Sequence, residues 1–168
     1  AKAQPPLQFR HLGLSDGPSS SVVTAIGSDS KGFVWFGSLD AVDRYDGARV
    51  RSFALGSGVE DSYTFSLAGS SDGTVWAGGA GGLWRRLPRA ADFRRVRLGS
   101  LADMSVRALE AGEETLWVGT LGDGLLRIEG GRVRRYTARG GHLASDTGNA
   151  GHLKGTGMIQ THGGVIGQ

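Results

Sequence analysis

A tryptophan recurs at a fixed interval of 41 residues in this chain, at Trp35, Trp76 and Trp117. Each tryptophan is followed two residues later by a glycine and, after a short gap, by a second apolar run. A regular period of this length indicates a repeat architecture, in which one small structural unit is copied along the chain. The next copy would carry its tryptophan at position 158, where the chain has Met158, so we interpret the last segment as a fourth, degenerate copy.

The sequence of each copy predicts four short antiparallel strands. In the first copy, apolar runs precede an alternating segment, at residues 22–26, 33–37, 41–45 and 49–53. Asp46 and Gly47, between the last two, are typical of a two-residue hairpin turn. The β-branched run at 22–26 favours an inner strand that is covered on both faces. No segment keeps a 3.6-residue period, so we expect almost no helix.

Four-stranded units of this length, repeated radially, are the blades of a β-propeller. We therefore predict an all-β fold: a β-propeller-like array of about four four-stranded antiparallel blades, forming a single domain over residues 1–168. The predicted repeats span about residues 19–56, 60–98 and 103–139, with the degenerate copy at 142–168.

Closure of the ring is expected to involve the first residues of the chain. The segment 7–12 alternates apolar and polar residues, as the last strand of each copy does, so it could complete the last blade. An open arc would instead leave unpaired strand edges and an uncovered blade face, which favour self-association. The alternative to closure by residues 7–12 is therefore a homodimer, in which two arcs complete one ring.

The recurring tryptophans have two interpretations. A row of exposed indoles would be a platform for sugars, whereas a fixed place in every repeat favours packing between neighbouring blades, where an indole buries a large area. We expect packing between blades. Trp84 lies outside the series and is the better candidate for an exposed aromatic side chain.

Composition limits the possible compartments and partners. The chain has no cysteine, so it forms neither a disulfide nor a thiolate metal site. No apolar run is long enough to span a membrane. The first six residues are small and polar, as in a mature terminus left after removal of a signal peptide, which favours a periplasmic or extracellular location.

The net charge of +3 comes almost entirely from arginine, with clusters at residues 85–86, 94–97 and 132–135. One interpretation is an acidic partner, such as nucleic acid or an acidic glycan. The alternation of arginine and valine at 49–51 and 132–134 favours instead the solvated face of an edge strand. We therefore expect no specific nucleic-acid partner.

No motif in the chain predicts a catalytic residue, a metal site or a cofactor. Residues 69–73 match the G-x-S-x-G pattern of hydrolases, but a strand rather than a helix is expected after them. The four histidines lack the spacing of metal ligands. No pair of carboxylates recurs at one position of the repeat, as a glycosidase would require.

The first copy closely resembles the two-component regulator propeller repeat. The similarity lies in residues 19–26, in 29–37 around the tryptophan, and in Asp43-Arg-Tyr-Asp-Gly47, and the resemblance covers roughly residues 7–139. The chain departs from the family in having few repeats, in lacking a leucine between Gly17 and Pro18, and in losing the fourth tryptophan.

This resemblance implies the periplasmic sensor region of a bacterial membrane receptor, whose output is a histidine kinase or a diguanylate cyclase. We therefore expect a non-catalytic module for ligand sensing or interaction. Two alternatives stay open. The repeats also resemble those of streptogramin lyases, which implies a metal-assisted enzyme. The degenerate copy suits a structural scaffold or a decayed fragment of a larger sensor.

Differences between the copies are expected to determine what such a module binds, at loops on one face or at the axis. The loops between the second and third strands vary, and they contain Asp40, Asp123 and His162. Together with Trp84, these are the predicted ligand-binding residues, for a small molecule or an oligosaccharide.

Overall fold

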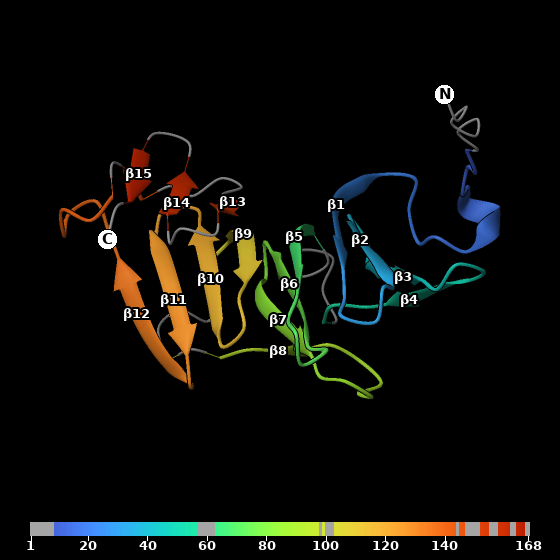
Figure 1. Ribbon diagram of the computed structural model, residues 1–168. Helices are drawn as coiled ribbons and strands as arrows, with labels where there is room; N and C mark the ends of the chain where they lie inside the picture. Colours follow the sequence, from blue (N-terminus) through green and yellow to red (C-terminus); the bar gives the residue numbers. More distant parts are fainter. Residues whose placement is uncertain are drawn as a thin grey trace, which may run out of the picture.

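The computed structural model describes residues 9–56, 63–97, 99, 103–143 and 145–146, and the backbone alone of 152–154, 158–161 and 164–166. Within these residues the regular secondary structure is almost entirely β-strand, with a short 3-10 turn at Leu14–Asp16 and no α-helix. Three four-stranded sheets stand side by side (Figure 1). The predicted all-β fold of four-stranded antiparallel blades is therefore confirmed.

Strand order within each of these sheets follows the order of the chain, and every neighbouring pair is antiparallel. The first sheet contains β1 (Val23–Ser28), β2 (Val34–Ser38), β3 (Val42–Tyr45) and β4 (Val50–Phe53). The second contains β5 (Thr64–Gly69), β6 (Val75–Gly79), β7 (Gly82–Arg86) and β8 (Arg94–Arg95). The third contains β9 (Val106–Ala111), β10 (Thr115–Thr120), β11 (Leu125–Glu129) and β12 (Arg132–Tyr136).

The fourth copy forms a smaller sheet. Its strands are β13 (His152–Lys154), β14 (Met158–Thr161) and β15 (Gly164–Ile166), again antiparallel and in chain order. β14 begins at Met158, the position at which the 41-residue period requires a tryptophan. The described residues of this copy therefore make three of the four strands of a blade, as predicted for a degenerate repeat.

Two apolar clusters fill the seams between the three larger sheets. The first lies between sheets one and two and is built around Trp35, with Phe53 and Phe93 at ring distances of 5.4 and 5.9 Å. The second lies between sheets two and three, where Trp76 packs against its edge. Packing between blades is thus confirmed for these two tryptophans. Trp117 belongs to neither cluster and lies 5.8 Å from Tyr136 within its own sheet.

The glycine two residues after each tryptophan allows the next sheet to approach closely. A Cβ at Gly37 would lie 2.5 Å from Thr64, and one at Gly78 would lie 2.3 Å from Val106. Both contacts are shorter than real Cβ contacts, and both are with β-branched side chains, which are stiff. In the third sheet, a Cβ at Gly119 would meet Ala108 of the same sheet at 3.1 Å.

Replacing Gly78 by Ala is therefore expected to lower the free energy of unfolding by about 1–3 kcal/mol, the usual cost of overpacking a core. The matched control is Gly119→Ala, at the same place in the third sheet, which should cost clearly less. Urea denaturation of both variants measures the difference. Equal losses would show that the approach of β9 to β6 is not what requires the glycine.

The third sheet differs from the others in the length of two connections. The turn between β9 and β10 is one residue shorter than the corresponding turn in sheets one and two. The loop between β10 and β11, at the opposite end, is one residue longer. The two changes cancel, so β11 keeps its position relative to β9.

The inner strand of the first sheet is exposed on one face. Val23 and Ile26 are 57% and 72% exposed, whereas the residues at the position of Ile26 in β5 and β9, Leu67 and Leu109, are buried. The expectation that residues 22–26 form a strand covered on both faces is therefore wrong. β5 and β9 each have a preceding sheet packed against them, and none of the described sheets packs on that side of β1.

The chain before β1 packs on the same exposed face. Residues 9–12 form no strand, and the Arg10 guanidinium donates to the Tyr45 hydroxyl at 3.2 Å. His11 and Leu12 line a pocket of about 320 Å³ together with Ile26, Phe36 and others of the first sheet. Residues 9–12 thus lie on the first sheet, and residues 7 and 8 lie outside the described residues, so closure of the last blade by residues 7–12 stays a prediction. The homodimer stays a prediction.

Candidate functional site

Each inner strand carries a bulge at the same place. The pairing register shifts by one residue between Val23 and Ala25 in β1, between Thr64 and Ser66 in β5, and opposite Gly119 and Thr120 in β9. The unpaired residues are Thr24, Phe65 and Arg107. Bulges re-aim side chains and are frequent next to functional sites. They lie where the second strand of each sheet ends, beside the loop that leads to the third strand.

These three residues form a row, because the inner strands β1 and β5, and β5 and β9, contact one another. The Thr24 hydroxyl donates to the carbonyl oxygen of Gly37 at 3.1 Å and to that of Thr64 in the next sheet. The Arg107 guanidinium stacks over the Phe65 ring, with Cζ 4.0 Å from the ring centroid. Arg107 Nε is buried and has no hydrogen-bond partner in the described part of the chain. The guanidinium of Arg107 and the ring of Phe65 are thus in contact where the second and third sheets meet.

Sequence reasoning missed this row. The strands that contain it were predicted, but a bulge leaves no mark in an apolar pattern, because one extra residue only looks like an imperfect alternation. The available signal was variation: these positions carry Thr, Phe and Arg, while the residues that flank them in the repeat are alike.

The loops between the second and third strands lie at the same end of the sheets. In the first sheet, Ser38 closes the loop: its hydroxyl donates to Ala41 O at 3.0 Å and accepts from the backbone N–H groups of Asp40 and Ala41. Thr120 has the same role in the third sheet, donating to Gly124 O at 2.7 Å. The carboxylate of Asp40 is exposed on this fixed loop. It stays a predicted ligand-binding group.

Asp123 has partners within the chain. Its carboxylate pairs with Arg135 at 3.0 Å, and its carbonyl oxygen accepts from Arg135 Nε at 2.7 Å. The backbone N–H groups of Gly122 and Gly124, on either side of Asp123, both donate to the carbonyl oxygen of Asp146. Asp123 is therefore oriented by β12 and by the segment that follows it, and it is half-exposed. Its predicted role in binding stays a prediction.

Trp84 corrects one expectation, because it is 6% exposed and belongs to the core of the first seam. Trp84 in β7 pairs with Ala77 in β6, and the equivalent pairs elsewhere place Asp43 opposite Phe36 and Leu126 opposite Val118. All three positions face the preceding side of their sheet and are buried. Trp84 is therefore a packing residue, and the expectation of an exposed aromatic was wrong.

The fourth predicted residue, His162, lies outside the described residues. Within the described ranges, no group of three or more histidine, aspartate or glutamate side chains is placed to hold a metal ion. In the same residues, no helix is both long and apolar enough to cross a membrane.

The buried carboxylate of Asp43 ties the entry of the chain to the first sheet. One oxygen accepts from the backbone N–H of Ser19 at 3.0 Å and from its hydroxyl at 2.8 Å, and the other accepts from the Ser52 hydroxyl. Asp43 is fully buried, so these donors take the place of water. The network holds residues 19–21 over the face that a preceding sheet covers in the other two copies.

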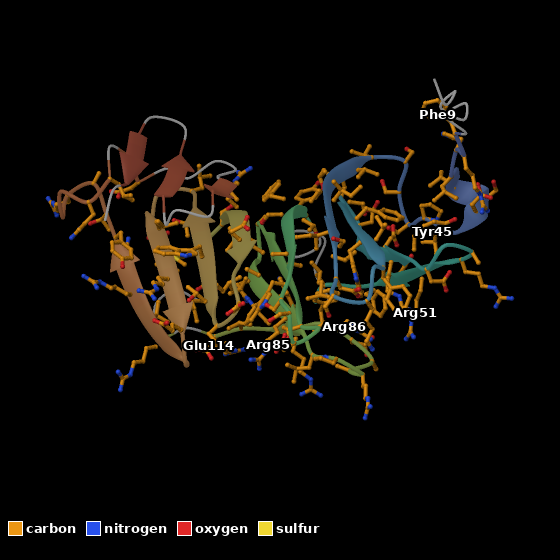
Figure 2. The ribbon with its side chains drawn as sticks, viewed as in Figure 1. Phe9, Tyr45, Arg51, Arg85, Arg86 and Glu114 are labelled. Carbon is orange, nitrogen blue, oxygen red and sulfur yellow. The ribbon has the colours of Figure 1, made fainter. Side chains whose placement is uncertain are left out.

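At the opposite end of the sheets, the strand register places arginines beside the tryptophans. Three cross-strand rows share this pattern: Trp35–Arg44–Arg51, Trp76–Arg85–Arg94 and Trp117–Arg127–Arg134. In each row the first guanidinium lies 5.8 Å from the indole. Figure 2 shows Arg51, Arg85 and Arg86 along the lower edge of the array, the edge to which Glu114 also belongs. These arginines are thus more than a solvated face, because several stack on aromatic rings.

Comparisons with known proteins bear on the fold. No protein-family model and no curated protein matches the sequence. The extracellular domain assigned to the hybrid two-component system BT3049 of B. thetaiotaomicron matches with a TM-score of 0.73 and 18% identity, over 93% of this chain and 24% of that chain. The extracellular domain assigned to the one-component system BT4673 of the same organism gives 0.72 and 13%, over 92% and 24%.

A virginiamycin B lyase from Staphylococcus aureus also matches, with a TM-score of 0.66 and 14% identity, over 88% of this chain and 51% of that chain. The chain therefore spans about a quarter of the length of the two extracellular domains and about half of the lyase. These structures confirm, at the level of the fold, the resemblance of its repeats to the sensor propellers of two-component regulators.

Proposed function

We propose that this chain is a non-catalytic module that binds a small molecule or an oligosaccharide as part of an extracytoplasmic sensor. The observation that carries the proposal is the bulge shared by the three inner strands, which gathers Thr24, Phe65 and Arg107 at one end of the array. In a propeller, inner strands surround the axis, where ligands commonly bind.

The chemistry of the row suits a polar ligand with a flat or ring-shaped part. Phe65 is half-buried and offers an aromatic surface, while Arg107 keeps an unpartnered buried Nε–H beside it. A buried donor without a partner is costly, so a ligand oxygen that accepts from it gains a hydrogen bond and relieves that cost. Asp40, exposed on its loop at the same end, adds an acceptor for hydroxyl groups.

The extracytoplasmic location rests on the solved structures that share the fold. The two sensor-type structures among them are extracellular domains. This likeness supports a module that meets its ligand outside the cytoplasm.

The test is a panel of neutral and acidic oligosaccharides, screened by isothermal titration. Phe65→Ala and Arg107→Ala are each expected to weaken binding of a positive compound by about tenfold or more, the loss that follows from removing a well-packed anchor. Arg132→Ala, an exposed arginine in the hairpin at the opposite end, is the matched control and should leave binding unchanged. Unchanged affinity in both row variants would refute the site.

Two other functions are tested by the same protein preparation. The likeness to virginiamycin B lyase favours an enzyme, so turnover of quinupristin, the compound present in one solved lyase structure, would replace the proposal if it were observed together with a bound metal. A scaffold or a decayed fragment predicts no ligand at all. A reading frame for a kinase or a cyclase next to this one supports the sensor over either.

A further inference from the structure

We propose a second binding site, for an oxyanion group such as sulfate, phosphate or carboxylate, formed by Arg44, Arg51 and Arg86 at the seam between the first and second sheets. It lies at the end of the array opposite to the bulged row. The two sites are therefore independent, and failure of one leaves the other standing.

The three guanidinium groups gather on one aromatic cluster. Arg44 lies 4.5 Å from the Phe33 ring, Arg51 lies 4.9 Å from Phe53, and Arg86 lies 5.1 Å from the same Phe53 ring. Arg44 and Arg51 are direct partners across β3 and β4, whereas Arg86 reaches the cluster from β7 of the second sheet. Both sheets are therefore needed to assemble the group.

Arg86 is placed where the fold does not require a charge. It follows Arg85 in β7, and the residue at the same register in the third sheet is Ile128, which packs against the core of the second seam. Arg86 is 9% exposed. The first seam thus buries a guanidinium where the second seam buries an aliphatic side chain, and burying a charge is costly unless it is paired.

The described residues do not provide that pairing. None of the three arginines forms an ion pair within them, and the Nε atoms of Arg44 and Arg86 are buried without a hydrogen-bond partner. Burial, and then the charges of Arg44 and Arg51, lower the pKa of Arg86 below its ordinary value, with Asp29 and Asp92 acting in the opposite direction. The Asp29 carboxylate already accepts from the Trp35 indole and from backbone N–H groups.

The chemistry of the missing partner follows from the geometry. The guanidinium carbons of Arg44 and Arg86 lie over the Phe33 and Phe53 rings, and these rings are not conventional hydrogen-bond acceptors, so guanidinium N–H groups remain for a ligand. Arginine edges bind oxyanions through paired, charge-assisted hydrogen bonds. An acidic ligand that supplies such a group would neutralise the mutual repulsion of the three charges and would also join the two sheets.

The experiment uses inorganic sulfate as the probe, added to the full chain and compared with sodium chloride at equal ionic strength. Sulfate is expected to raise the melting temperature beyond the chloride control and to change the fluorescence of the protein, because Trp35 lies 5.6 Å from Arg86. Arg86→Ile, which copies the third sheet, should weaken sulfate binding by about tenfold or more, as expected for loss of a charged hydrogen bond.

Two further variants make the result decisive. Arg85→Ala, an exposed neighbour in the same strand, should bind sulfate as the unchanged protein does. If Arg86→Ile does not fold, Arg51→Ala removes an exposed member of the cluster and must show the same loss. A sulfated disaccharide compared with its unsulfated form distinguishes a glycan source from the free ion, and binding of either supports the site. Sulfate that acts no differently from chloride, or unaltered binding by Arg86→Ile, overturns it.

Discussion

Replacing Trp35 by Ala is expected to lower the free energy of unfolding by about 3–5 kcal/mol, the usual loss for a large aromatic side chain in a core. Trp35 is 1% exposed and is the centre of the first seam, in contact with Phe53 and Phe93. Its indole N–H also donates to Asp29 at 2.9 Å, which fixes the turn before β2. Chemical denaturation followed by circular dichroism gives the loss.

Trp117→Ala is the matched control, because it changes the same residue at the same position of the repeat. Trp117 is only partly buried and lies on the side of the third sheet away from both clusters. Trp117→Ala should therefore lower the free energy of unfolding by much less than Trp35→Ala does. Similar losses would mean that the repeat position itself, rather than burial between sheets, determines the contribution of the tryptophan.

The second large effect is expected at Asp43. Its replacement by Ala removes the fully buried acceptor of the backbone N–H and hydroxyl of the half-buried Ser19 and of the hydroxyl of Ser52. Hydrogen bonds to a charged group contribute about 1.5–3 kcal/mol each, and water can replace the carboxylate only in part at the half-buried Ser19. We expect a destabilisation of about 3 kcal/mol and faster hydrogen exchange at the Ser19 amide.

Asp43→Asn keeps one acceptor oxygen and should fall between Asp43→Ala and the unchanged protein. Asp40→Ala, an exposed aspartate three residues earlier, should change stability by no more than about 0.5 kcal/mol. If Asp43→Ala lowers only the protection of the Ser19 amide against hydrogen exchange and leaves the free energy of unfolding unchanged, then Asp43 holds only the segment that enters the first sheet and not the sheet itself.

The fold could be predicted because the signal was periodic. One tryptophan-containing strand with its flanking turns was enough to identify a four-stranded unit. The recurrence of this pattern then predicted three sheets, with the strand order that the structure has. Repetition could not show what covers each unit. Residues 22–26 have the apolar pattern of an inner strand, yet one face of β1 is exposed. The burial of that face depends on whether another sheet packs against β1, and the sequence of the segment does not contain this information.

The candidate sites depended on contacts that no single segment determines. Trp84 was expected to be exposed because it lies outside the 41-residue tryptophan series. Its pairing opposite Ala77, however, directs its side chain into the first seam. The Phe65–Arg107 stack joins two strands from adjacent sheets, and the three-arginine cluster joins β3, β4 and β7. Arginine clusters were visible in the sequence, but the partners of each guanidinium became visible only with the seam.

The exchange of one residue between the two ends of the third sheet bears on how such repeats diverge. A residue added to a loop is accommodated by the loop itself and leaves the pairing and the facing of the flanking strands unchanged. In the third sheet the longer loop and the shorter turn lie at opposite ends, and the strands still pair in the same order as in the other two sheets. The connections at either end of a blade can therefore change in length during evolution, and copies of one ancestral blade can present different loops while the interval between their tryptophans stays at 41 residues.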